Sequence, residues 1–114
     1  MKLLLGGILV LAALGLVVGG VWNPDLLYKC PYADITPALQ VFRSINYVPL
    51  EHIQEVVGNS NAIGYTTQTY DIFIANSITE EAQARVLTHE LCHVYEMAVL
   101  DIPVEISAQH KGWR

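Results

Sequence analysis

The hydrophobic pattern divides the chain into three kinds of segment. Residues 3–22, LLLGGILVLAALGLVVGGVW, are twenty consecutive uncharged positions. Residues 62–76 are rich in β-branched and aromatic side chains and partly alternate with polar ones, whereas residues 79–100 repeat apolar side chains every three or four positions. A long apolar run predicts a membrane segment, a period of two predicts strands, and a period near 3.6 predicts an amphipathic helix.

The apolar run at 3–22 is long enough to span a bilayer. At about 1.5 Å per residue, twenty helical residues reach about 30 Å, the thickness of the hydrocarbon core. The apolar core of a secretion signal is usually only about 7–15 residues long and ends at a small-residue cleavage site. We therefore interpret residues 1–22 as a single-pass transmembrane anchor, with a cleaved signal, and hence a secreted protein, as the alternative. Lys2 precedes the run, which predicts that the globular part lies on the extracytoplasmic side.

A linker and a small domain are expected to follow the anchor. Residues 23–37 contain three prolines, Pro24, Pro31 and Pro37, and are interpreted as the linker. In residues 38–45, apolar side chains recur at helical spacing, so a short helix is predicted there, beginning near Thr36 and Pro37. Residues 38–114 would form the domain.

The middle of the domain is expected to contain two adjacent strands. The segment LEHIQEVVG, residues 50–58, is compatible with a helix or a strand, and GNSN at 58–61 is typical of a turn. The segments AIGYTTQ and YDIFIAN that follow have the composition of strands.

A long helix is predicted from about Thr79 to Leu100. Ser77 and Glu80 match a capping box, Thr79 is a second possible cap, and Pro103 disfavours helix in the residues just before it. One apolar stripe along this helix would face the core; its members are Leu87, Leu91, Val94 and Ala98.

The charge of the chain bears on its binding partners, and its two cysteines bear on the redox state of its compartment. Five basic and eleven acidic residues follow Trp22, and this acidic excess argues against a nucleic-acid partner. The two cysteines, Cys30 and Cys92, could form one disulfide in an oxidising compartment, or could both be small buried hydrophobic residues in a reducing one.

The stretch VLTHELCHVYE carries the chemistry. His89 and His93 are one helical turn apart, so both imidazoles can bind one ion. Glu90 directly follows His89, where a carboxylate can take a proton from a metal-activated water without being a ligand. Because this motif lies in the middle of the predicted helix and among apolar positions, we interpret it as a metal site and not as a chance surface pattern.

At this point the chain resembles a known family. The segment VLTHELCHV, preceded by YDIFIAN, resembles the small single-domain zincin metallopeptidases over roughly residues 62–108. The resemblance implies a Zn²⁺ ion, His89 and His93 as its ligands, and Glu90 as the general base. It also implies a peptide substrate lying along an edge strand, for which YDIFIAN is the candidate.

Three residues are candidates for the third ligand. Glu105, in PVEISA, resembles the downstream Glu-x-x-Ala helix of gluzincins, and is the first choice. His110, in HKGWR, resembles the third histidine of SprT-like proteins, although Lys111 stands where that group usually has glycine. Glu96 shares the helix face of His89 and His93 but is a turn further on, so we expect it to face solvent or to support the site indirectly.

Other polar residues have simpler interpretations. His52 stands alone and is expected to be a surface or structural histidine. Tyr65, Tyr70 and Tyr95 could each hydrogen-bond an oxyanion, but tyrosines in small domains usually pack. Cys92 is expected to point about 100 degrees away from His93 around the helix, which favours core packing or a disulfide over metal binding.

Together these features predict an α+β zincin-like domain, a short sheet packed on the HExxH helix, behind a transmembrane helix. The predicted function is zinc-dependent peptide hydrolysis at a membrane. One alternative is a catalytically inactive, membrane-tethered zincin-like binding module. The other is a SprT-like metalloprotease acting on DNA-bound proteins, against which the acidic charge and the anchor both argue.

Overall fold

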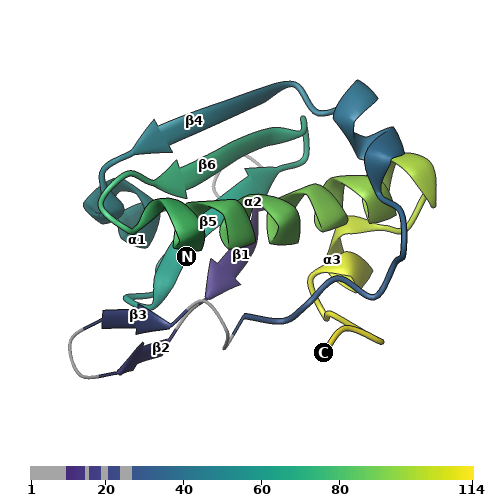
Figure 1. The fold of residues 1–114 in the computed structure, drawn as a ribbon. Helices are drawn as coiled ribbons and strands as arrows, with labels where there is room; N and C mark the ends of the chain where they lie inside the picture. Colours follow the sequence, from purple (N-terminus) through teal and green to yellow (C-terminus); the bar gives the residue numbers. More distant parts are fainter. Residues whose placement is uncertain (1–9, 15, 19–20, 24–26) are drawn as a thin grey trace.

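The domain is a four-stranded sheet with a helix on each face. The computed structural model describes residues 10–14, 16–18, 21–23 and 27–114. The sheet contains β1 (Val10–Leu14), β5 (Ala62–Thr67), β6 (Asp71–Ala75) and β4 (Ser44–Val48), in that order. β4 runs parallel to β6, while β5 is antiparallel to both of its neighbours. The α+β class predicted from the sequence is confirmed (Figure 1).

Alternate side chains of β6 build the two halves of the core. Ile72 and Ile74 pack with Val86 and Val94 of the long helix α2 (Glu80–Val94). Phe73 and Ala75 pack with Ile53 of α1 (Leu50–Val57). Because successive side chains of a strand point to opposite faces, α2 and α1 cover opposite faces of the sheet. Residues 50–58, which the sequence left open between helix and strand, are therefore mostly helical.

Strand β5 approaches α2 very closely at one glycine. A Cβ atom at Gly64 would lie 2.6 Å from Val86 Cγ1 and 3.0 Å from the Phe73 carbonyl oxygen. Any larger residue would therefore push α2 away from the sheet. This close approach brings Glu90 of α2 next to β5.

The long helix begins where the sequence predicts and ends in a wider turn. The Thr79 side chain caps α2 by accepting a hydrogen bond from the Ala82 amide at 3.1 Å. A π-helical turn, η4 (Tyr95–Val99), continues it, with the Leu100 amide bonded to the Tyr95 carbonyl. Asp101, with φ of 58°, then reverses the chain before α3 (Val104–Ser107).

The short helix predicted at 38–45 is only partly correct. A 3₁₀ helix, η3 (Thr36–Gln40), starts at the predicted Thr36 and Pro37. The chain then enters β4 at Ser44, so the last predicted helical residues are extended. Pairing with β6 outweighs the weak local helical pattern because it completes the hydrogen bonds of a whole strand.

The described part of segment 3–22 does not confirm the predicted transmembrane helix. It forms strands: β1, and a hairpin of β2 (Leu16–Val18) with β3 (Val21–Asn23). Leu11 and Ala13 of β1 are 1% and 0% exposed, so this strand is part of the folded core. Among the residues that the structure describes, no helix is both long and apolar enough to cross a bilayer. The rest of the segment, residues 3–9, 15 and 19–20, lies outside the described residues.

The segment before η3 is attached to α2 by a disulfide. Cys30 and Cys92 are bonded, which settles the pairing that the sequence left open. Leu27 is buried in the core that α2 forms with the sheet. Residues 27–37, interpreted above as part of a linker, therefore pack on the domain.

The disulfide should contribute strongly to stability. It closes a loop with a sequence separation of 62 residues, and restricting the unfolded chain to this extent corresponds to about 4 kcal/mol in the chain-entropy model. We expect the double variant Cys30→Ser, Cys92→Ser to lose most of this free energy of unfolding in urea titrations. A reducing agent should then destabilise the wild type and leave the double variant unchanged; equal stability of the two proteins under oxidising conditions would contradict the prediction.

Candidate metal centre

Three imidazoles meet at the carboxyl-terminal half of α2. The Nε2 atom of His110 lies 3.1 Å from that of His93 and 3.3 Å from that of His89. In a tetrahedral zinc site, bonds of about 2.0–2.1 Å separate two ligand nitrogens by about 3.3 Å. The three ligand atoms lie within 4.8 Å of one another, so they are spaced as one ion requires.

His110 reaches the other two histidines from the turn that follows α3. It has a positive φ of 54°, and Gly112, with φ of 81°, bends the chain again. The ring of His110 stacks on that of Tyr28 at 4.7 Å between centroids. Because helix α3 stops at Ser107, the turn can aim His110 back at α2.

The structure does not bring Glu105 into this group. Glu105 is exposed on α3, and the segment that follows the chain reversal at Asp101 brings His110, not Glu105, to the two α2 histidines. The two HExxH histidines therefore lie together with His110, the alternative candidate for the third ligand, and not with Glu105, the first choice.

Hydrogen bonds fix the orientation of the two α2 histidines. His89 Nδ1 lies 2.9 Å from the Tyr28 carbonyl oxygen, which can only accept a hydrogen bond. His93 Nδ1 lies 2.9 Å from Ser107 Oγ. With the proton on Nδ1, each ring presents the lone pair of Nε2 to the centre of the group, which is the arrangement of a metal ligand.

Glu96 supports the orientation of His93 through Ser107. Ser107 donates a hydrogen bond of 2.6 Å to Glu96 Oε1, which leaves the Ser107 oxygen free to accept from His93. The other carboxylate oxygen of Glu96 accepts hydrogen bonds from Tyr32 at 2.6 Å and from Trp113 Nε1 at 3.0 Å. At 3% exposure, Glu96 is buried. Of the two roles open to it, the indirect support of the site is the one the structure shows.

Burial keeps the three imidazoles neutral. Desolvation lowers the pKa of His89 to about 4 and holds the pKa of His93 well below its usual range. Desolvation also lowers the pKa of the half-buried His110. Neutral imidazole is the form that binds a metal ion, so at neutral pH all three are in the state that coordination needs.

Glu90 faces the sheet in a closed environment. Its Oε1 accepts a hydrogen bond of 2.6 Å from Thr66 Oγ1 on β5, while Oε2 has no partner among the described residues. The side chain is fully buried, and this desolvation raises the pKa of its carboxyl group well above the ordinary value. This closed setting favours the neutral form of the carboxyl group, and the side chain is not exposed to solvent.

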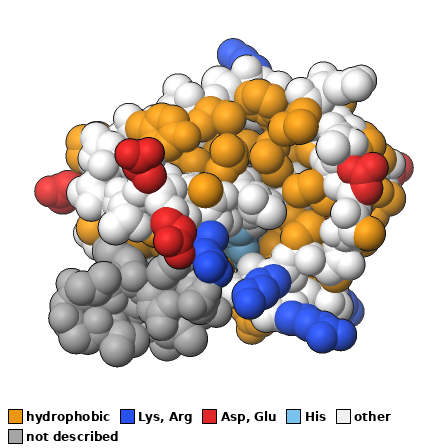
Figure 2. Space-filling view, viewed as in Figure 1, with side chains coloured by type: hydrophobic (Ala, Val, Ile, Leu, Met, Phe, Trp, Pro, Cys, Tyr) orange, Lys and Arg blue, Asp and Glu red, His pale blue; other side chains and the backbone are white. Residues whose placement is uncertain are grey.

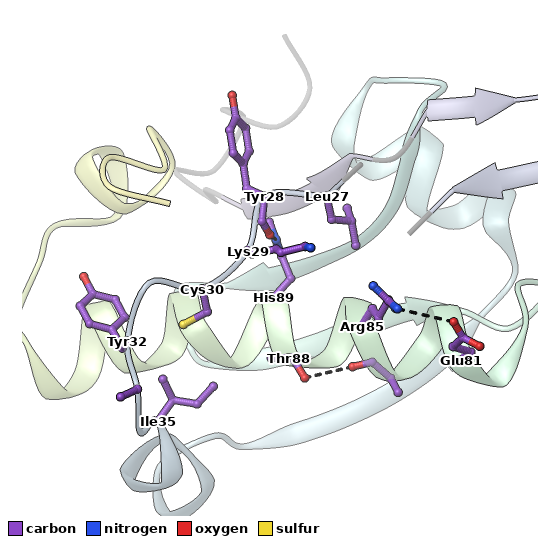
Figure 3. A pocket seen from close by; sticks show the side chains of 12 residues that line it. Leu27, Tyr28, Lys29, Cys30, Tyr32, Ile35, Glu81, Arg85, Thr88 and His89 are labelled. Atoms are coloured by element: carbon purple, nitrogen blue, oxygen red, sulfur yellow. Dashed lines mark hydrogen bonds and ion pairs between the residues drawn. The ribbon is translucent and has the colours of Figure 1, made fainter. Parts of the chain in front are cut away.

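A pocket opens beside His89. It has a volume of about 530 Å³ and lies between residues 27–35 and the face of α2 that carries Ala84 and Thr88 (Figure 3). Leu27 and Ile35 give it an apolar wall, and Lys29 and Arg85 add positive charge. Figure 2 shows a histidine at the bottom of a hollow bordered by basic side chains, below a surface rich in apolar ones. Of the three histidines, His110 is partly exposed, whereas His89 and His93 are buried.

Residues that the sequence interpretation set aside lie elsewhere. His52 Nε2 is 2.9 Å from the Tyr65 hydroxyl, on the α1 face of the sheet. Cys92 is fully buried in its disulfide. Strand β6, suggested as the edge for a substrate, lies between β5 and β4 and is not an edge strand. Sequence reasoning missed Tyr28, Ser107 and Thr66, because no local pattern marks a residue whose role is to bond a distant side chain.

Comparison with family models, curated proteins and solved structures found no match to this chain. The functional interpretation therefore rests on the residues and geometry of the site.

The buried histidines and Glu90 should give the metal-free protein opposing pH dependences. The folded pKa of His89, about 4, lies below its ordinary value of 6.5, so its contribution to stability is present above pH 6.5 and is lost, by up to about 3 kcal/mol, as the pH falls towards 4. The pKa of Glu90 is raised above 4.5, so its contribution is present below that pH and is lost as the pH rises.

The variant Glu90→Gln removes one of these two opposing effects. Its free energy of unfolding, measured in chelator by urea titration, should therefore rise more steeply than that of the wild type between about pH 4.5 and 6.5. A flat profile for this variant would mean that the histidines are not held neutral by burial.

Proposed function

We propose that the protein is a zinc-dependent metallopeptidase whose ligands are His89, His93 and His110. The observation that carries the proposal is the convergence of three neutral Nε2 atoms at distances of 3.1 and 3.3 Å, beside a glutamate in HExxH spacing. Three protein ligands that leave one position open are typical of catalytic zinc. The hydrogen bonds at Nδ1 of His89 and His93 also support a functional ion, because they direct the Nε2 lone pairs of both rings at the same point.

The chain's own groups have distinct tasks in this mechanism. When bound, zinc lowers the pKa of water and polarises a peptide carbonyl. Glu90, once ionised, accepts the proton of the attacking water and passes it to the leaving amine. The pocket beside His89 holds a side chain of the peptide, with Leu27 and Ile35 favouring an apolar group there.

The choice of His110 brings the proposal closer to the SprT-like resemblance than to the gluzincin one. A DNA-associated role still does not fit, because the eleven acidic residues outnumber the basic ones. The Cys30–Cys92 disulfide, which leaves no free cysteine, instead supports a location in an oxidising compartment. We propose that the domain works on the extracytoplasmic side of a membrane.

One observation favours a second candidate, a zincin-like binding module without activity. Glu90 is fully buried with a raised pKa, and a protonated carboxyl cannot act as a base. For the peptidase, this closed arrangement must open so that water reaches Glu90 and removes the desolvation that raises its pKa.

Replacing Glu90 by glutamine distinguishes the two candidates. Glu90→Gln should keep about one zinc per chain and lower hydrolysis by roughly 10²–10⁴-fold, the usual contribution of a general base. Zinc content by mass spectrometry and cleavage of a quenched fluorescent peptide library measure both quantities. Undiminished cleavage in the variant would reject Glu90 as the base, and a wild type that binds zinc but cleaves nothing would favour the binding module.

A pair of substitutions tests the third ligand. His110→Ala should weaken zinc binding by more than the roughly 10–100-fold that follows loss of a supporting partner, because it removes a ligand. Glu105→Ala is the matched control on the same short segment and should bind like the wild type, since its side chain is exposed outside the group. Competition with a chelating dye measures both affinities. The opposite ranking would return the third ligand to Glu105.

A further inference from the structure

Strand β1 covers the one edge of the sheet that borders the metal centre. It pairs antiparallel with β5, and its residues Leu11, Ala12 and Ala13 lie opposite Thr66, Tyr65 and Gly64. Thr66 holds Glu90, and Gly64 is where α2 comes closest to the sheet. The partner residues of β1 are therefore those that position the proposed general base.

The contacts of β1 extend to α2. Leu11 and Ala13 are buried, and Ala13 packs in the core that Val86 and Leu91 of α2 form with the sheet. The backbone of Ala12 lies near enough to the His89 ring to influence its pKa. The extended backbone of β1 thus lies beside one of the proposed metal ligands.

This placement explains why Glu90 is sealed. With β1 in position, Glu90 Oε2 is buried and has no hydrogen-bond partner among the described residues. A buried polar atom left unpaired in this way destabilises the closed form. The backbone groups along this edge of β5 are already paired with β1, so a peptide cannot form a strand there. Glu90, the proposed base, is also out of contact with water.

The residues of β1 also belong to a segment that is apolar enough to enter a membrane. Residues 3–22, which include β1, carry no charge, and as a helix they would match the thickness of a bilayer. A residue cannot pair with β5 and lie in a membrane at the same time. Withdrawal of β1 would leave the N–H and C=O groups of β5 unpaired, and such an edge accepts an extended strand.

We propose that β1 is an internal blocking strand, which closes the peptide-binding edge of β5 in the free protein and is withdrawn when the apolar segment enters a lipid bilayer. The closed form protects the site away from the membrane. The open form accepts an extended, uncharged peptide in place of β1, with a small side chain opposite Gly64. Cleavage of that peptide rests on the proposed function, whereas the opening itself does not.

Hydrogen exchange of the full-length protein tests the opening. Amides of residues 62–67 should exchange at least about tenfold faster with phosphatidylcholine vesicles than in buffer, because half of them lose β1 as a partner. Amides of β6, which stays between β5 and β4, serve as the internal reference. Equal protection of β5 in both conditions would overturn the proposal.

A cross-link supplies the matched control. Val10 and Thr67 are partners in the β1–β5 register, and the Cα atoms of antiparallel partners lie about 4.5–5.5 Å apart, within reach of a disulfide. The oxidised double variant Val10→Cys, Thr67→Cys should keep β5 protected in vesicles, while the single variant Val10→Cys should open like the wild type. Opening of the cross-linked protein would show that the exchange arises elsewhere.

Peptide binding separates this proposal from the peptidase. The labelled peptide KKVLAALKK, which carries the sequence of β1, should bind the protein in vesicles and not the cross-linked form, as measured by fluorescence anisotropy in the Glu90→Gln background. Lipid-dependent binding without any zinc-dependent hydrolysis in the wild type would keep the blocking strand and reject the peptidase. Hydrolysis that is equally fast without lipid and in the cross-linked protein would keep the peptidase and reject the blocking strand.

Discussion

The constraint on which the site depends is the burial of four ionisable side chains within two turns of one helix. His89, Glu90, His93 and Glu96 are each at most 3% exposed. A polar group taken out of water is tolerated only when it finds a partner or loses its charge. Their own helix cannot supply partners, because its backbone groups are already bonded to one another. Each side chain therefore requires a group from a part of the chain distant in sequence, and the fold around α2 is largely the set of segments that deliver those groups.

Glu96 shows how one such requirement organises several segments. Its carboxylate accepts hydrogen bonds from Tyr32, Ser107 and Trp113, which lie before η3, on α3 and at the carboxyl end. These hydrogen bonds converge on the two oxygens of one buried carboxyl group, so the three segments are held together there. His110 lies between Ser107 and Trp113 in the sequence. Because both of these residues are hydrogen-bonded to Glu96, the chain is held in place on either side of His110. The hydrogen bonds that Ser107 and Trp113 make to Glu96 therefore also position the imidazole of His110.

This dependence explains which features the sequence could predict. Local pattern identified α2, β5 and β6, because periodicity and capping reside within each segment, and it identified His89, Glu90 and His93 because a helix fixes their spacing. It ranked Glu105 above His110 because PVEISA resembles the Glu-x-x-Ala helix of gluzincins and because Lys111 departs from the SprT-like pattern. Helix α3 stops at Ser107, whose hydroxyl bonds His93 and Glu96, and that stop depends on tertiary contacts. For residues 10–14, hydropathy describes an affinity for apolar surroundings and cannot distinguish a bilayer from the apolar face of α2.

The closed arrangement around β1 and the proposed catalytic step place opposite demands on Glu90. A closed, dry site stabilises the neutral forms of Glu90 and the histidines and packs Leu11 and Ala13 in the core. Proton transfer at neutral pH instead needs an ionised carboxylate within reach of water. One static arrangement cannot meet both demands, because the desolvation that favours the neutral carboxyl of Glu90 over the ionised one opposes its ionisation by the same free energy. The proposed withdrawal of β1 resolves the conflict, because β1 pairs with β5 alone in the described sheet, so that β6 stays paired with β5 and β4 when β1 leaves.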